Sequence, residues 1–411
     1  MTAGPEPSAF PPVLRADWLR APAGLALLSE GSVTTTPGFS AAGVAAGLKL
    51  SGAHDLGLLV ADEPSVSALV DTRNALPSAA VVRNREQPRS AFRAVVVNAG
   101  SANAATGSPG VNDAERMATL AGDAVGLPAG EVAVCSTGTI GDRLDMRRIA
   151  DGIEAASRAR STQGGPSFGS AICTTDAAPK AGAFRLALGG RDVIIGAAAK
   201  GAGMIRPDMA TMLAYITTDA GIASAELQRL TAAAAAESFN RISVDGQMSP
   251  SDTVLVLANG AAGRLDEAQG QVFAAGLAAV MRWLAIQIVR DGEGARHVVR
   301  LTVRGARDGA EAERVARHVA DSPLVKTAVA GGDPNWGRVA QAVGQALAGA
   351  PGTAVEPEIA VDGLPADRAA EAMAGGEFDL TVALERGEAE AEVWFSDLTH
   401  DYVSLNADYR T

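Results

Sequence analysis

A threonine stands near mid-chain, at the end of a segment punctuated by Gly and Pro that reads Lys200-Gly-Ala-Gly-Met-Ile-Arg-Pro-Asp-Met-Ala-Thr211. A threonine hydroxyl is a weak nucleophile unless a base lies beside it. Cutting the chain just before the threonine supplies that base, because an α-amine titrates at about pH 7.7–8.0 and can take up a proton at neutral pH. The segment therefore predicts a proenzyme that cuts itself at Ala210–Thr211, with an ordinary Gly-rich turn as the alternative.

Two further segments place hydroxyl groups beside apolar strands. Ser136-Thr-Gly-Thr-Ile-Gly141 follows the apolar run 132–135, so its backbone N–H groups and a hydroxyl could face a developing oxyanion. An ordinary turn between a strand and a helix would have the same pattern. Thr174-Thr-Asp, followed by Lys180, is typical either of a polar pocket wall or of a capped turn.

Three more segments carry groups that could contact a ligand. In Asp291-Gly-Glu-Gly-Ala295, a carboxylate held between two glycines is suited to bind a substrate ammonium, and a helix C-cap turn is the alternative. The turn 332–338, which holds Trp336 and Arg338, is interpreted as structural packing beneath a site. The C-terminal residues 406–411 follow a strand-like run without a polar tail, which favours a docked end over a frayed one.

Strands and helices must position these residues, and both alternate along the chain. Apolar runs predict buried strands at 56–60, 94–98, 132–135 and 253–258, and apolar spacing predicts helices at 113–125, 223–239, 311–320 and 339–347. A Ser/Gly-rich surface loop is expected at 161–169, and strands are expected through 390–406. The pattern favours an α+β fold of layered sheets packed between helices.

Composition narrows the class of protein. The 411 residues carry a net charge of −12 without a Lys/Arg-rich stripe, which argues against a nucleic-acid or anionic-membrane partner. Cys135 and Cys173 form no CxxC pair, and the four histidines lack metal-ligand spacing, so we expect a reducing compartment and no metal. Residues 1–20 lack the apolar core of a signal peptide, and 272–289 is expected to be a buried helix. A cytoplasmic protein is expected.

Together these segments resemble the ornithine acetyltransferase (glutamate N-acetyltransferase) family of arginine biosynthesis. The family's autoprocessing signature is similar to Lys200-Gly-Ala-Gly-Met-Ile, Met209-Ala-Thr-Met-Leu and Thr217-Thr-Asp-Ala here. Other landmarks of the family match 43–47, 98–107, 136–141, 174–180, 238–245, 252–260, 291–295, 322–328, 332–338 and 406–411. The resemblance covers nearly the whole chain from about residue 32.

The resemblance implies a role for each matching position. Thr211 would be the nucleophile and the first residue of a β chain, while Thr137 and Gly138 would form the oxyanion hole. The amino-acid substrate would be contacted by Thr174, Lys200, Thr211, Glu293, Asn406 and Thr411. An acetyl group would pass from N2-acetylornithine to glutamate in a ping-pong cycle through an acetyl-threonine. No cofactor is implied, although some members also use acetyl-CoA as donor.

The resemblance also implies an organisation. A loosely ordered lead at 1–30 would precede an α chain at 31–210, and the β chain at 211–411 would include a smaller C-terminal lobe. The two chains would assemble as α2β2. The fold implied is the family's own layered fold.

Two loops depart from the family pattern. Gln247-Met-Ser-Pro-Ser251 replaces an Asp-Thr-Ser-Thr-Asn-like run, and Arg296-His297 replace a Thr-Lys-like pair. If these loops line the pocket, the amine substrate could be a different, specialised metabolite. Water could also resolve the acyl-enzyme, which would make the protein an amidase or aminopeptidase. A binding protein that keeps the fold without catalysis is the hypothesis from a different class.

Overall fold

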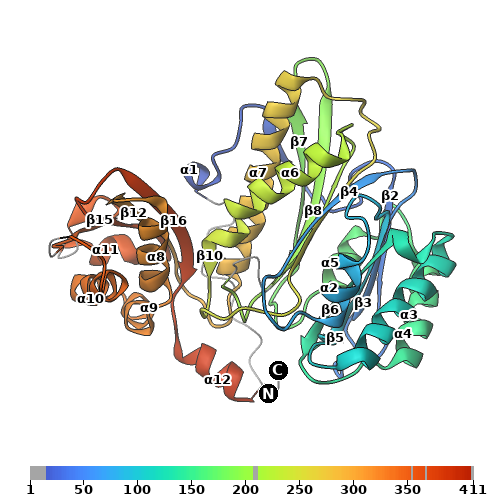
Figure 1. Cartoon of the computed structure of the whole chain (residues 1–411), viewed down its shortest axis with the longest axis horizontal. Helices are drawn as coiled ribbons and strands as arrows, with labels where there is room; N and C mark the ends of the chain where they lie inside the picture. The colour runs from blue at the N-terminus through green and yellow to red at the C-terminus, as the bar shows by residue number, and fades with distance from the viewer. Residues whose placement is uncertain (1–14, 207–211, 353–354, 366–367, 409–411) are drawn as a thin grey trace.

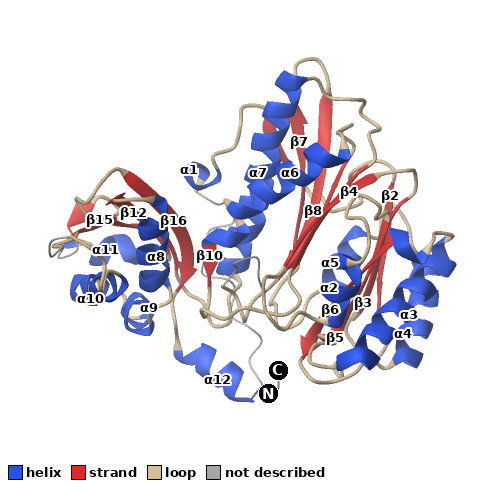
Figure 2. Cartoon of the chain, viewed as in Figure 1, coloured by secondary structure: helices blue, strands red, loops and turns tan. Residues whose placement is uncertain are grey.

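The structure is a computed structural model that describes residues 15–206, 212–352, 355–365 and 368–408. Its main body consists of two sheets stacked face to face, with helices on the outer face of each, and a smaller lobe lies at one side (Figures 1 and 2). The layered α+β architecture expected from the sequence is confirmed. The predictions for Ala210, Thr211 and Thr411 fall outside the described residues.

The first sheet has the order β1-β7-β8-β9-β11-β4. Its strands are β1 (Leu25–Leu28), β4 (Val66–Asp71), β7 (Lys180–Ala187), β8 (Asp192–Lys200), β9 (Leu213–Thr218) and β11 (Thr253–Ala258). β8 and β9 pair antiparallel, so that Lys200 at the end of one lies opposite Leu213 at the start of the other. β11 runs parallel to β9. The segment 201–212 therefore joins two neighbouring strands at one end of this sheet.

Two helices cover the outer face of the first sheet: α6 (Ser224–Ala236) and α7 (Glu267–Arg290). Asp266 begins α7 with a capping box, in which its carboxylate accepts the Gln269 N–H at 2.8 Å. α7 is long and apolar enough to cross a membrane, but 67% of its apolar window is buried inside the protein. Burial of a side chain such as Leu284 contributes roughly 1.5–3 kcal/mol, so α7 is a core helix, as its apolar run predicted.

The second sheet has the order β2-β3-β5-β6. Its strands are β2 (Phe39–Val44), β3 (Leu56–Ala61), β5 (Ala94–Ser101) and β6 (Val132–Thr139). Its outer face packs against α2 (Ala79–Arg85), α3 (Gly107–Val125) and α4 (Met146–Ala159), and η1 (Ala129–Glu131) leads into β6. Its inner face meets the first sheet through a shared apolar core.

A short helix, α5 (Gly165–Ala171), lies against the second sheet where a surface loop was expected, so that prediction is wrong. The glycines allow close packing. A Cβ at Gly165 would lie 2.0 Å from Ser32 Oγ, and one at Gly164 would lie 1.7 Å from the Ala41 carbonyl oxygen. Phe168 packs edge-on against Tyr215 of the first sheet at 5.3 Å between ring centroids.

The smaller lobe is a third sheet in the order β10-β16-β12-β15-β13-β14. Its strands are β10 (Ile242–Ser243), β12 (Val298–Ala306), β13 (Glu358–Val361), β14 (Leu364–Pro365), β15 (Glu377–Ala383) and β16 (Ala389–Ser396). The lobe's helices are α8 (Gly309–Ala320), α9 (Pro323–Ala330), α10 (Trp336–Ala346) and α11 (Ala370–Met373). β10 follows η2 (Phe239–Arg241) and pairs with β16, which ties the lobe to the main body.

Three segments differ from expectation. α3 begins at Gly107, because Pro109 falls in its first turn, where a missing N–H is tolerated. The strand-rich stretch expected through 406 ends with β16, and α12 (His400–Asp408) follows. The described part of the lead contains α1 (Ala16–Leu19) and β1, and Trp18 there is fully buried and donates to Asp379 Oδ1 at 3.0 Å.

Candidate active site

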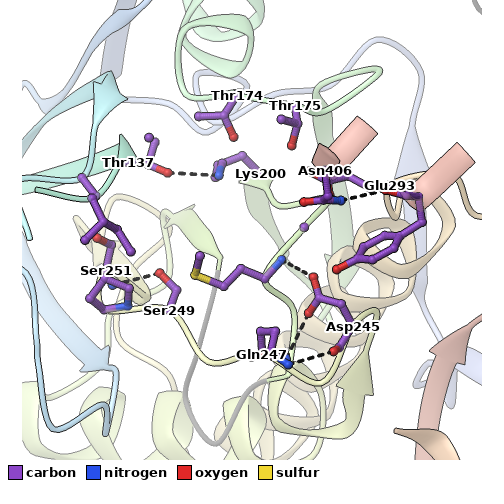
Figure 3. Close-up of a pocket in the computed structure, with 17 residues that line it drawn as sticks. Thr137, Thr174, Thr175, Lys200, Asp245, Gln247, Ser249, Ser251, Glu293 and Asn406 are labelled. Carbon is purple, nitrogen blue, oxygen red and sulfur yellow. Dashed lines mark hydrogen bonds between the residues drawn. The ribbon is translucent and has the colours of Figure 1, made fainter. Parts of the chain in front are cut away.

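A pocket of about 240 Å³ lies where the two main sheets, the end of α7 and α12 meet. The sequence-predicted residues that line it come from five distant segments: Thr137, Gly138, Thr174, Lys200, Glu293 and Asn406. Figure 3 shows the side chains of Thr137, Thr174, Lys200, Glu293 and Asn406 around the cavity. The fold thus brings together every predicted site residue that the structure describes.

Thr137 and Gly138 lie near the end of β6, which includes the first four residues of the predicted polar turn 136–141. Gly138 has φ +127°, and a Cβ there would lie 2.4 Å from the Gly100 carbonyl carbon of β5. Only glycine fits this position, because both the backbone conformation and the close approach exclude a side chain. The constraint leaves the Gly138 backbone facing the pocket instead of a side chain.

Lys200, the last residue of β8, donates from Nζ to Thr137 Oγ1 at 3.1 Å. Both side chains are largely buried, with 6% of Lys200 and 8% of Thr137 exposed. Because the lysine occupies a lone pair of the hydroxyl oxygen, the hydroxyl proton of Thr137 remains available to an acceptor in the pocket. The pair is therefore suited to stabilise negative charge on a bound carbonyl oxygen.

Glu293 lies on the turn that follows α7, at the opposite wall of the pocket (Figure 3). Its Oε2 accepts from Asn406 Nδ2 of α12 at 2.7 Å. The backbone of Gly203 makes room for this carboxylate, since a Cβ there would lie 2.5 Å from its atoms. A cation on one wall and a carboxylate on the other suit a substrate that carries both charges, such as an amino acid.

Asp245 and Tyr402 complete this wall, and neither was predicted from the sequence as a site residue. Asp245 accepts the Ile205 N–H at 2.9 Å and also the N–H of Met204, so it holds the chain just before the segment 207–211. Burial raises the pKa of Asp245, and burial together with the charges of Asp245 and Glu293 raises the pKa of Tyr402 to about 12. The Val-Asp-Gly turn, with Gly246 at φ +72°, was the available signal for Asp245.

The two loops that differ from the family pattern, 247–251 and 296–297, lie in different parts of the structure. Gln247, Ser249, Pro250 and Ser251 line the pocket, so that loop can affect which substrate binds. Arg296 and His297 do not contribute to its lining; His297 Nδ1 instead contacts Asp397 Oδ2 at 2.8 Å. Only the first loop therefore retains its bearing on substrate identity.

The other sequence features considered lie outside the lining of the pocket. The 332–338 turn lies in the C-terminal lobe, where Asn335 caps α10 by accepting the Arg338 N–H at 3.2 Å. Burial raises the pKa of Cys135 to about 11 and of Cys173 to about 12, so neither thiol is a thiolate at neutral pH. Across the described ranges, no group of three His, Cys, Asp or Glu side chains could hold a metal ion.

The segment that carries the predicted cut begins and ends beside the pocket. Met204 lines the cavity, and Met212 leads into β9, whose first residue pairs with Lys200. Thr253 of β11 donates to the Met212 carbonyl oxygen at 3.0 Å, which fixes the chain at that point. The described residues on both sides of 207–211 are thus anchored at the site.

Comparison with known proteins identifies the family. The ArgJ family model matches residues 40–411. The arginine biosynthesis bifunctional protein of Symbiobacterium thermophilum is 44% identical over 399 residues, covering 93% of this chain and 99% of that protein. Its Bacillus subtilis counterpart is 39% identical over 398 residues, covering 93% and 97%. The solved ornithine acetyltransferase of Mycobacterium tuberculosis, in complex with ornithine, is 38% identical with a TM-score of 0.42 and covers 45% of this chain and 98% of its own. The resemblance seen in the sequence is confirmed, and the chain belongs to the ArgJ family.

Proposed function

We propose that this protein transfers an acetyl group from N2-acetylornithine to glutamate, after cutting itself at Ala210–Thr211. The observation that carries the proposal is the convergence of Thr137, Lys200 and Glu293 on one pocket, beside both ends of the segment that contains Thr211. Membership of a family whose relatives are described as arginine biosynthesis proteins favours this substrate pair over hydrolysis or an unrelated amine.

The first half-reaction forms an acetyl-enzyme. Thr211 Oγ attacks the acetyl carbonyl carbon while its own α-amine accepts the hydroxyl proton, and the carbonyl electron pair moves onto oxygen. Thr137 and the Gly138 N–H stabilise that oxyanion. When the tetrahedral intermediate collapses, the C–N bond breaks and the leaving amine takes the proton from the Thr211 ammonium. Free ornithine departs, and the acetyl group stays on Thr211 Oγ.

The second half-reaction reverses these steps with glutamate. Its amine attacks the acetyl-threonine ester, and the Thr211 hydroxyl is restored as acetylglutamate leaves. Lys200 pairs with a substrate carboxylate and Glu293 with a substrate ammonium, while Thr174, Asn406 and Thr411 complete the substrate contacts. No cofactor takes part. The word bifunctional in the relatives' names supports acetyl-CoA as a second donor.

The denatured intact mass of the purified protein tests the proposal. We expect two species that match 1–210 and 211–411, together with acetylglutamate formed from acetylornithine and glutamate. A single species of 411 residues without transfer would contradict the proposal. We also propose that the cut chains assemble as α2β2 in the cytoplasm, which native mass spectrometry and fractionation would check.

Glu293→Gln is expected to raise the KM for acetylornithine by roughly 10- to 100-fold with a smaller effect on kcat. The substitution keeps an oxygen for Asn406 but removes the negative charge that would pair with the substrate ammonium. Steady-state kinetics with both substrates would measure it. Glu237→Gln, on an exposed side chain near the end of α6, is the matched control, and an unchanged KM in Glu293→Gln would remove the assignment.

Residues added after Thr411 are expected to lower kcat/KM by roughly tenfold or more, because Asn406 places the C-terminal helix against the pocket. A C-terminally tagged protein should recover its activity when a protease removes the tag. The same tag at the N-terminus is the control. Equal activity of the tagged and untagged proteins would show that the C-terminus is remote from the site.

A further inference from the structure

A second charged cluster lies directly behind the pocket, and the proposed chemistry does not use it. Lys180, the first residue of β7, is buried with 5% of its surface exposed. Its ammonium contacts Asp176 Oδ1 and Asp291 Oδ2. Asp176 precedes β7, whereas Asp291 caps the C-terminal end of α7, more than a hundred residues away. One lysine therefore joins two remote segments.

The two carboxylates extend this cluster to the backbone of two site segments, 174–177 and the turn that follows β8. Asp176 accepts the Gly201 N–H at 2.6 Å and the Thr174 N–H at 2.8 Å. Asp291 accepts the Ala177 N–H at 3.1 Å. These two segments present Thr174 and Lys200 to the pocket, and Asp291 itself stands two residues before Glu293.

The charges favour a permanent ion pair between Asp176 and Lys180, whereas burial raises the pKa of Asp291 against the opposing effect of Lys180. Burial opposes the ionisation of Asp176, but the ammonium groups of Lys180 and Lys200 hold the pKa of that carboxyl well below its usual range. Burial likewise opposes the charge of Lys180, yet the two carboxylates raise its pKa above the ordinary value. A buried ion pair with satisfied hydrogen bonds fixes geometry, and its loss leaves an uncompensated buried charge.

We propose that Asp176, Lys180 and Asp291 form a clamp that fixes Glu293 opposite Lys200 and ties the two products of self-cleavage together at the pocket. The inference rests on the proposed function, because the cut assigns Asp176 and Lys180 to the 1–210 chain and Asp291 to the 211–411 chain. The three are positioning residues, since they act on the substrate through Thr174, Lys200 and Glu293.

The roles of the two carboxylates separate kinetically. Asp291 joins the turn that carries Glu293 to Lys180 and to the Ala177 N–H, whereas the Gly201 N–H next to Lys200 is bound by Asp176. Asp291→Asn is therefore expected to raise the KM for acetylornithine by roughly 10- to 100-fold and to change kcat by less than about threefold. Asp176 holds the backbone next to Lys200, which contacts Thr137. Asp176→Asn should therefore lower kcat. A purely structural pair would not divide the two parameters in this way.

The experiment compares the wild type, Asp291→Asn and Asp291→Glu with Glu377→Gln as the matched control. Arg290 and Glu377 form another buried ion pair one residue from Asp291, but it joins α7 to β15 within the 211–411 chain. Kinetics are measured together with the urea concentration at which native mass spectrometry detects separated chains. We expect Asp291→Asn to raise KM and separate the chains at lower urea, Asp291→Glu to retain most of both properties, and Glu377→Gln to leave KM unchanged.

The outcomes distinguish the two proposals. An uncut or inactive wild type would contradict the proposed function, and the clamp with it. A cut and active wild type whose Asp291→Asn variant keeps its KM within about twofold would overturn the clamp alone. An equal rise in KM for Asp291→Asn and Asp291→Glu would also overturn it, because the charge would then not be the cause. If Asp291→Asn fails to fold, Asp176→Asn takes its place in the test. An Asp176→Asn variant whose kcat and KM both equal those of the wild type would overturn the clamp.

Discussion

Thr211→Ala is expected to yield a single uncut chain and to lower acetyl transfer by at least about 10⁴-fold. The substitution removes the hydroxyl that would attack both the preceding peptide bond and the acetyl donor, so one change abolishes two reactions. Denatured intact mass reports the cut, and formation of acetylglutamate reports the transfer.

Thr211→Ser is the matched control for this prediction. It keeps a hydroxyl beside an α-amine and loses only a methyl group, so it should still cut and still transfer. Cleavage of Thr211→Ala at the wild-type rate would place the nucleophile elsewhere. Cleavage without transfer in Thr211→Ser would separate processing from catalysis.

Thr137→Val is expected to lower kcat by roughly 10²- to 10³-fold with little change in KM. Valine has nearly the same shape but cannot donate to the oxyanion, and it leaves Lys200 Nζ without its hydroxyl acceptor at 3.1 Å. Because the oxyanion exists only along the reaction path, its loss should affect kcat. Single-turnover formation of the acetyl-enzyme would measure the effect on the chemical step.

Two variants control for side effects of that change. Thr137→Ser keeps the hydroxyl and should retain most activity. Thr175→Val makes the same substitution at another pocket threonine to which no role in the reaction is assigned. If Thr137→Val reacts at the wild-type rate, the oxyanion must be stabilised by backbone N–H groups alone.

The sequence predicted the strands and the main helices well where an apolar run is long or bounded by clear turn residues. The strand 253–258 coincides with β11, and the buried helix at 272–289 lies within α7. The α5 helix was missed because its glycines resemble those of a loop. Gly164 and Gly165 stand there because Ala41 and Ser32, which are remote in sequence, approach so closely that a Cβ would not fit.

Some residues of the candidate site could likewise be predicted from local sequence, and others could not. Thr137, Lys200 and Glu293 stand in motifs with recognisable local chemistry, and the fold brings them together. Tyr402 carries no local signal, since it enters the pocket only because α12 lies against the turn after α7. Arg296 and His297, which differ from the family pattern, were expected to affect the substrate because they follow Glu293 closely in sequence. Their side chains instead contact Asp401 and Asp397. Proximity in sequence did not predict which side chains reach the cavity.

The pairing of Lys200 with Leu213 has a consequence for how the protein folds before and after the cut. In the uncut precursor, β8 and β9 are neighbours joined by a short connection, so their ladder forms at the small entropic cost of closing one loop. A cut at 210–211 would leave that ladder intact while removing the connection. If the cut protein unfolds, its two chains separate, and refolding then requires them to associate in solution at a rate that depends on their concentration. The mature protein would then preserve a structure that only its precursor can form unimolecularly, and its lifetime would depend on the barrier to unfolding.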